Sequence, residues 1–333
     1  MKKLLVGSFA FVFALVLSTS AFARTLEITE YCGENGLINR GNDPVQSGDV
    51  LNIKKDIKQE TDSATYGPEE NRILSEGIVI NGGGHTLDGN GFGGFKMARY
   101  DSGNLDDANS EINNTKLTNY NGNAIEISNP YSSYCTFFLT LKNVHISSNS
   151  GNSIFLEDAD LLVSNVHALD GISGNGNLIV GNGEDAVGPL VLGGDSGDFN
   201  GNLTVDNATI SLLPEASYFG EKTHNFYKNG TLNLANNYID DSVVLFDLEI
   251  SGTMKLNFDV DLAEQAIDDV QFGDVYSQQE EMAVAQDPTE SAIKINLNKI
   301  NVLTDANSKV TVYEFGTNAE EYINVGQKEV LGP

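Results

Sequence analysis

Ser196 is the residue whose setting first suggests chemistry. It lies in the stretch Gly193-Gly-Asp-Ser-Gly-Asp-Phe199, and a serine within Gly-Asp-Ser-Gly can act as a nucleophile. Such a serine needs a histidine base within hydrogen-bond reach and a carboxylate that orients the base. The rest of the chain must supply both groups.

The four histidines do not supply that base in a recognisable setting. His85 lies in a turn-strand stretch, and none of the four stands in the Ala-Ala-His-Cys motif of trypsin-like proteases. His145 and His167 occupy equivalent places in Asn-Val-His-Ile and Asn-Val-His-Ala, so we expect them to stack on one face of a repeating structure. Asp-Phe follows Gly197 where such proteases have Gly-Pro or Ser-Pro. The stretch around Ser196 is therefore predicted to be a turn, and we assign no catalytic residue.

Paired acids offer a second kind of chemistry. Asp106-Asp107, Asp240-Asp241 and Asp268-Asp269 are adjacent carboxylates, and glycoside hydrolysis uses two carboxylates that face one substrate. Adjacent strand residues point to opposite faces, so these pairs are predicted to be solvated loops. With no CxxC and no Cys/His cluster, we do not expect a structural zinc site. We expect no cofactor beyond weak surface binding of Ca²⁺ and name no metal ligand.

The first 23 residues have the features of a secretory signal peptide. Lys2 and Lys3 precede an apolar run, and Ala21-Phe-Ala23 is a small-x-small site, so cleavage is expected between Ala23 and Arg24. The net charge of −28 predicts that the chain does not bind nucleic acid. Cys32 and Cys135 either form a disulfide in an oxidising compartment or are two separate buried thiols.

A degenerate repeat dominates the chain beyond this segment. Short aliphatic runs alternate with Gly, Asn, Asp and Ser, which is typical of strands and turns. Five stretches share the form aliphatic-x-Asn-x-x-apolar and begin at Leu117, Leu141, Val163, Val205 and Leu234, with Val180-Gly-Asn182 as a weaker match. A period in the low twenties predicts an all-β solenoid, whereas a β-sandwich with Asn in its turns is the alternative.

Stacked asparagines are expected at one corner of this solenoid. An amide side chain can hydrogen-bond along the stack and tolerates left-handed backbone. The predicted ladder consists of Asn119, Asn143, Asn165 and Asn207, with Asn236 or Asn237 as a continuation.

The predicted organisation has four parts. Residues 1–23 form the signal peptide, 24–75 an N-terminal cap, 76–276 the β-helix repeats, and 277–333 an acidic turn with terminal β rungs. Residues 101–114 and 214–230 are polar and are predicted to be loops that leave the coil.

The opening SGDVLNIKKDI with EGIVINGGGHTLDGNG, and the later GTLNLANNYI with GTMKLNFDVDL, resemble the rungs of right-handed parallel β-helix proteins. That group includes pectin-lyase-like enzymes and the passenger domains of bacterial autotransporters. The chain departs from the enzymes because it has no Arg after Arg99 and lacks the Gly-His-Gly and Arg-Ile-Lys motifs. It departs from whole autotransporters because it has no predicted membrane barrel.

The resemblance implies an exported, adhesin-like protein of a Gram-negative bacterium, secreted or displayed on the cell surface or outer membrane, with a role in virulence. Its expected partners are glycans or proteins on host or neighbouring cells, and a barrel outside this chain is an expected attachment. We predict a non-catalytic structural and binding role. The alternative is a secreted polysaccharide-active lyase or glycosidase.

Overall fold

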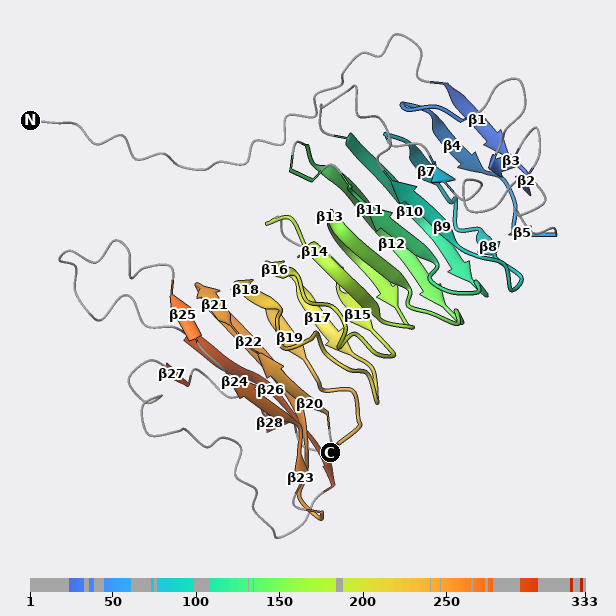
Figure 1. Ribbon diagram of the computed structural model, residues 1–333. Helices are drawn as coiled ribbons and strands as arrows, with labels where there is room; N and C mark the ends of the chain where they lie inside the picture. Colours follow the sequence, from blue (N-terminus) through green and yellow to red (C-terminus); the bar gives the residue numbers. More distant parts are fainter. Residues whose placement is uncertain are drawn as a thin grey trace, which may run out of the picture.

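A computed structural model gives the structure of the chain (Figure 1). It describes residues 24–32, 36–38, 45–60, 73–74, 77–98, 108–130, 132–133, 135–183, 188–239, 241–245, 247–264, 266–272, 275–277, 294–304, 324–325 and 330–331. The predicted signal peptide, residues 101–107 and most of the predicted acidic turn lie outside these ranges.

All regular secondary structure among the described residues is β-strand, and nearly all strand pairs are parallel. One 24-stranded sheet holds most of them, and β2–β3 and β20–β24 form two small sheets. Figure 1 shows the strands stacked side by side along one long axis. The predicted all-β, parallel architecture is therefore confirmed, and the arrangement is compatible with a β-helix.

The pairings arrange the strands in three columns, and we call one passage of the chain past the columns a rung. Column one contains β1 (Thr25–Ile28), β4 (Val50–Ile53), β7 (Val79–Asn81), the first part of β10 (Ala108–Thr118) and of β12 (Phe137–Ser147), the middle of β13 (Ile154–Ala168), the end of β14 (Ile172–Val180), β16 (Asn202–Asp206), β18 (His224–Lys228), β21 (Leu248–Ser251) and β25 (Val275–Ser277).

Column two contains β5 (Ile57–Lys58), β8 (Thr86–Asp88), the later parts of β10, β12 and β13, β15 (Leu190–Leu192), β17 (Thr209–Leu212), β19 (Thr231–Asn233), β22 (Thr253–Asp261) and β26 (Lys294–Thr304). Column three contains β6 (Ile73–Leu74), β9 (Phe95–Ala98), β11 (Ile125–Ser128) and the starts of β13 and β14. The remaining strands are β2 (Glu30–Cys32), β3 (Gly36–Ile38), β20 (Ser242–Leu245), β23 (Ala266–Ile267), β24 (Asp269–Phe272), β27 (Asn324–Val325) and β28 (Val330–Leu331).

The core is a continuous stack of aliphatic side chains between the columns. β12 shows the required alternation, because its buried and less buried positions follow a period of two up to the corner at Lys142-Asn143. Residues from all three columns belong to one buried cluster. In column one the buried residues that lie directly over one another are Leu51, Ile80, Ile112, Leu141, Val163, Val180, Val205, Tyr227 and Ile250.

Asparagines in the left-handed region turn the chain between columns one and two. Asn143 and Asn165 have φ of 54° and 55°, and Nδ2 of Asn165 donates to Oδ1 of Asn143 at 2.8 Å. Asn207 has φ of 49°, and its Nδ2 donates to the backbone oxygen of Gly183 at 3.2 Å. Asparagine suits this corner because its amide bonds locally while its backbone tolerates positive φ.

The register corrects the predicted ladder at Asn119 and at its continuation. Asp206 pairs with Lys228 and Thr209 with Thr231, so Asn229 follows Asn207 at the corner, whereas Asn236 and Asn237 come after column two. Ile112, rather than Leu117, lies beside Leu141, so Asn114 stands next to Asn143. Asn114 Oδ1 accepts a hydrogen bond from Asn143 Nδ2 at 3.1 Å. Asn119 lies five residues further on and donates to Asp88 instead. The aliphatic-x-Asn pattern begins at Ile112 and again at Leu117, and the copy that begins at Ile112 is in register with Leu141.

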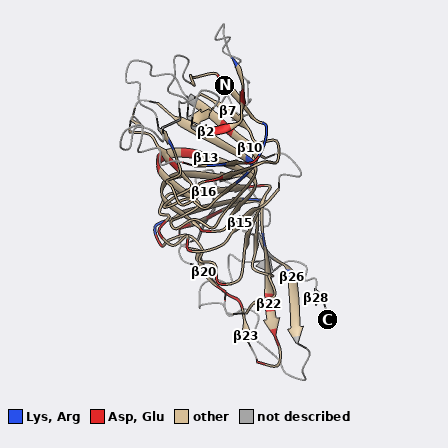
Figure 2. Cartoon of the chain, turned by 90° about the vertical axis from the view of Figure 1, so that its right-hand side faces the viewer, with Lys and Arg blue, Asp and Glu red and all other residues tan. Residues whose placement is uncertain are grey.

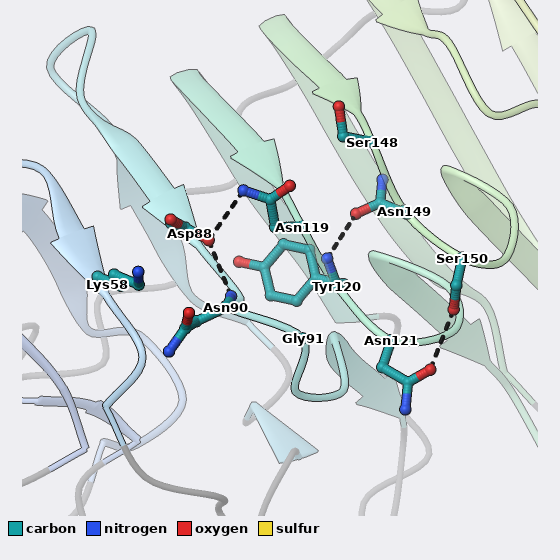
Figure 3. Close-up of a pocket in the computed structure, with 10 residues that line it drawn as sticks. All are labelled: Lys58, Asp88, Asn90, Gly91, Asn119, Tyr120, Asn121, Ser148, Asn149 and Ser150. Carbon is teal, nitrogen blue, oxygen red and sulfur yellow. Dashed lines mark hydrogen bonds between the residues drawn. The ribbon is translucent and has the colours of Figure 1, made fainter.

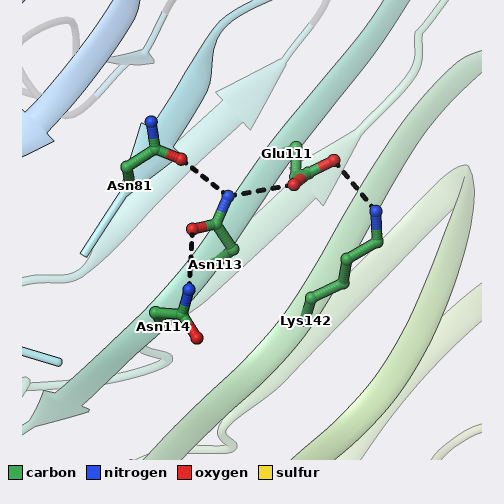
Figure 4. Close-up of polar contacts among 5 residues, drawn as sticks. All are labelled: Asn81, Glu111, Asn113, Asn114 and Lys142. Carbon is green, nitrogen blue, oxygen red and sulfur yellow. Dashed lines mark hydrogen bonds and ion pairs between the residues drawn. The ribbon is translucent and has the colours of Figure 1, made fainter. Parts of the chain in front are cut away.

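Further polar ladders run along the outer faces. In Figure 4, Asn113 donates from Nδ2 to Asn81 Oδ1 at 2.8 Å and to Glu111 Oε1 at 2.9 Å, while Lys142 pairs with Glu111 at 3.2 Å. Asn81 in turn donates to Asn52. These contacts provide hydrogen-bond partners for side-chain amides that lie about 4.8 Å apart on successive rungs.

Two predicted loops are partly strands. Residues 108–114 belong to β10, where Ser110 points inward and accepts a bond from the Gly77 N–H. Residues 224–228 form β18, where Asn225 is buried and donates to the Thr223 oxygen. Both segments carry polar residues at inward positions, so their sequences do not show the alternation of apolar and polar residues that indicates a strand. β1 and β4 lie within 24–75, the segment predicted as a cap, and they pair in parallel with each other and, through β4, with β7.

Replacing Asn143 separates the two roles of the corner asparagine. Asn143→Ala should lower the free energy of unfolding by about 1–2 kcal/mol, because alanine resists left-handed backbone. Asn143→Gly should cost less, because glycine adopts positive φ freely. Urea unfolding measures both. Equal losses would mean that the backbone conformation at this corner is not the constraint.

Candidate polar groove

An open groove of about 600 Å³ crosses four successive rungs where column two ends. The segments after β8, β10 and β12 line it, together with Lys58 at the end of β5 (Figure 3). Its lining residues are Lys58, Asp88, Asn90, Gly91, Asn119, Tyr120, Asn121, Ser148, Asn149 and Ser150.

Left-handed backbone shapes the groove as it shapes the asparagine corner. Asn90, Asn119 and Ser148 have φ of 52°, 59° and 62°. Asn119 and Ser148 come one residue after the register partners Thr118 and Ser147, and Asn90 comes two residues after their partner Asp88. A left-handed residue therefore recurs close to the same place on each rung. This repetition places short polar side chains in rows along the stack.

Hydrogen bonds hold the groove's walls. Asp88 Oδ1 accepts from the Asn90 N–H at 2.8 Å and from Asn119 Nδ2 at 3.2 Å. Asn149 Oδ1 accepts from the Tyr120 N–H at 3.0 Å, and the Ser150 hydroxyl donates to Asn121 Oδ1 at 3.0 Å. Figure 3 shows that the Asp88–Asn90 bond lies within one turn and that the other bonds link neighbouring rungs. The groove is thus formed before any ligand binds, which limits the entropy cost of binding.

Tyr120 forms the floor of the groove and belongs to the core. Its side chain is 2% exposed, and its hydroxyl donates to the Leu87 backbone oxygen at 3.2 Å. Burial raises the pKa of Tyr120 well above its usual value, so the phenol stays neutral. Its ring packs against Phe95 with centroids 5.7 Å apart.

The lining is suited to binding rather than to acid–base chemistry. Lys58 and Asp88, register partners on β5 and β8, are its charged members, and they balance each other within a strongly acidic chain. One carboxylate lines the groove, whereas glycoside hydrolysis uses two. The amides and hydroxyls can donate to and accept from a polar ligand.

Ser196 lies in a turn, as predicted. The stretch connects β15 to β16, and Ser196 is 0% exposed. Its Oγ accepts a hydrogen bond from the Ile172 N–H at 3.1 Å. The hydroxyl therefore ties two rungs together and does not face solvent.

His145 and His167 stack as predicted. They are register partners on β12 and β13, with ring centroids 5.4 Å apart. Burial, then the neighbouring His167 and Lys116, lower the pKa of His145. His224 lies elsewhere, with Nδ1 2.8 Å from Asp247 and Nε2 3.6 Å from Glu249. Because the two carboxylates contact opposite ring nitrogens, these three groups do not converge on one point.

The prediction of solvated Asp-Asp pairs is wrong for two residues. Asp241 and Asp268 are 4% and 5% exposed, whereas Asp269 is exposed. Asp241 and Asp268 lead into β20 and β24 and turn inward there, so strand alternation sends Asp269 outward. Asp106-Asp107 and Asp240 lie outside the described residues.

Several predictions remain untested. Cys135 is buried, but the side chain of Cys32 lies outside the described part of the structure, so their pairing stays a prediction. The predicted cleavage between Ala23 and Arg24 also stays a prediction, because Ala23 lies outside the described residues. Arg24 binds Asp49 through Nε at 2.9 Å and Nη2 at 2.5 Å. Within the described ranges no three His, Cys, Asp or Glu residues are grouped to hold a metal ion.

We found no match to this chain among protein-family models, curated proteins or solved structures. In the part of the chain that the structure describes, no helix is long and apolar enough to cross a membrane.

Two substitutions of Tyr120 test whether the groove's floor is part of the core. Tyr120→Ala should lower the free energy of unfolding by about 3–5 kcal/mol, because it leaves a cavity between rungs. Tyr120→Phe should cost about 1 kcal/mol, the worth of one hydrogen bond. Chemical denaturation measures both. A Tyr120→Ala protein as stable as the parent would contradict this placement of the ring.

Proposed function

We propose that this chain is an exported, right-handed parallel β-helix that serves as a non-catalytic structural and binding protein. It resembles an autotransporter passenger and acts at the surface of a Gram-negative bacterium or after release. The in-register columns support a coil, and the signal-like N-terminus supports export. In the surface-displayed form of this proposal, the chain is attached to an outer-membrane barrel outside this sequence.

The polar groove is the observation that carries the binding role. It is open, formed in advance, and lined by amides and hydroxyls whose bonds to one another leave further hydrogen-bonding capacity. The exposed side chains of Asn90, Asn119 and Asn121 lie along it. An extended polar chain on a partner cell, either a glycan or a protein segment, fits these properties.

Charge favours such a partner over a polyanion. The chain carries a net charge of −28, which repels nucleic acid over distances comparable to the Debye length. Lys58 and Asp88 leave the groove itself close to neutral. A neutral or weakly charged ligand therefore approaches the groove without a large electrostatic cost.

The test uses the purified chain on an array of glycans and on intact host and bacterial cells. Lys58→Ala combined with Asn121→Ala should weaken binding about 5-fold to 100-fold, because each lost hydrogen bond to a ligand is worth about 0.5–1.5 kcal/mol. Biolayer interferometry measures the affinity for whichever glycan or cell-surface protein binds.

Lys222→Ala is the matched control, because Lys222 is exposed and lies outside the groove. Equal binding by the groove variant and the control would contradict a groove-centred role. Shortening of a bound polysaccharide during incubation would favour the polysaccharide-active enzyme instead.

A further inference from the structure

Three buried aspartates gather near the C-terminal end of the stack, far along the chain from the groove. Asp241 precedes β20, Asp268 precedes β24, and Asp259 lies in β22. They are 4%, 5% and 0% exposed. The Asp269 N–H donates to the Asp241 backbone oxygen at 2.8 Å, which holds the segments before β20 and β24 on neighbouring rungs. We call these three residues the aspartate cluster.

The cluster joins a projecting hairpin to the stack. β22 pairs antiparallel with β23 through Val260 and Ile267, and Figure 2 shows both strands, with β26 beside β22, extending beyond the earlier rungs. The Asp268 N–H donates to the Asp259 oxygen at 3.3 Å, and the Asp259 N–H donates to Asp268 Oδ2 at 2.7 Å. This reciprocal pair fixes the return strand of the hairpin against β22.

The carboxylates differ in how well they are satisfied. Asp259 accepts from the N–H groups of Asn236 and Tyr238 at 2.9 and 3.1 Å, and from Asn301 Nδ2 at 2.7 Å. Asp241 accepts from Asn236 Nδ2 at 2.6 Å. Oδ1 of Asp268 is buried and has no hydrogen-bond partner among the described residues. A buried anionic oxygen without a donor is costly, so Asp268 is the member best suited to be neutral.

The surroundings of Asp268 act in the same direction. The charged groups that act on it are Asp241, from the segment before β20, and Asp259, from β22, while β26 contributes the neutral Asn301 to the cluster. Burial, then these two carboxylates, raise the pKa of Asp268 to about 7, against the opposing effect of backbone hydrogen bonds from Asp259 and Asp241.

We propose that Asp268 holds a proton when the hairpin is docked and that loss of this proton loosens the β22–β23 hairpin from the β20–β24 pair. The carboxylic acid places one fewer negative charge in the cluster. Its deprotonation leaves three buried carboxylates next to one another. The hairpin then opens locally while the remaining rungs stay folded.

The sign of the effect follows from the protonation of the two states. The closed state binds the proton up to about pH 7, whereas an exposed aspartate releases it near pH 4. The stabilisation is therefore fully present below about pH 4 and is lost as pH rises through about 7. Between about pH 6 and about pH 8 the equilibrium for opening should shift about tenfold toward the open state.

Hydrogen exchange of the full chain, read by mass spectrometry and corrected for the intrinsic pH dependence of exchange, measures this opening. Protection of peptides from β22 and β24 should fall about tenfold between about pH 6 and about pH 8. Protection in β16 and β17 should not change. Constant protection in β22 and β24, or the same loss in all rungs, would overturn the proposal.

Three variants localise the proton. Asp268→Asn mimics the neutral acid and should abolish the pH-dependent loss, whereas the exposed Asp269→Asn, the matched control, should retain it. Asp241→Asn removes a neighbouring charge and should move the midpoint to lower pH, which keeps the proposal testable if Asp268→Asn fails to fold. A pH-dependent loss that persists in Asp268→Asn would contradict the assignment.

Calcium distinguishes a proton from a metal ion. Millimolar CaCl₂ should leave the exchange midpoint unchanged. Protection restored by calcium at about pH 8 would show that the cluster neutralises its charge with a cation, and the proposal would fall.

Discussion

Every rung of this chain must place its inward side chains directly over those of the rung before it. Parallel pairing fixes the spacing at about 4.8 Å, so an inward residue that slips by one position would face solvent. The column from Leu51 to Ile250 meets this condition over nine rungs. The length of the stack, its core and its outer surfaces all follow from that repetition. The stability of the fold is therefore spread along the stack rather than concentrated in one centre.

The same repetition generates the surface that we assign to binding. A chain that turns close to the same place on each rung needs residues that tolerate positive φ, and asparagine and serine meet that need at Asn90, Asn119 and Ser148. Their side chains then project in rows about 4.8 Å apart. The groove is therefore a consequence of how column two ends, and it can vary in ligand preference without a change in the core.

The sequence predicts the strands and parallel stacking because alternation and turn residues are local signals. It predicts the turn at Ser196 and the stacking of His145 on His167 for the same reason. It does not distinguish Asn114 from Asn119, because register depends on which residues the neighbouring rung turns inward. Nor does it show that Asp268 is buried, since an adjacent acid pair looks solvated until the strand start is known. The groove joins three turns about 30 residues apart, so no local motif announces it.

The register between β10 and β12 is the feature on which the stack most depends, and paired cysteines test it most directly. Glu111→Cys with Thr140→Cys places two outward thiols on neighbouring strands in register, within the distance that a disulfide spans. Lys116→Cys with Thr140→Cys represents the register that would put Asn119 beside Asn143. Mass spectrometry after mild oxidation should find the first cross-link and not the second. Formation of the second cross-link in place of the first would contradict the account.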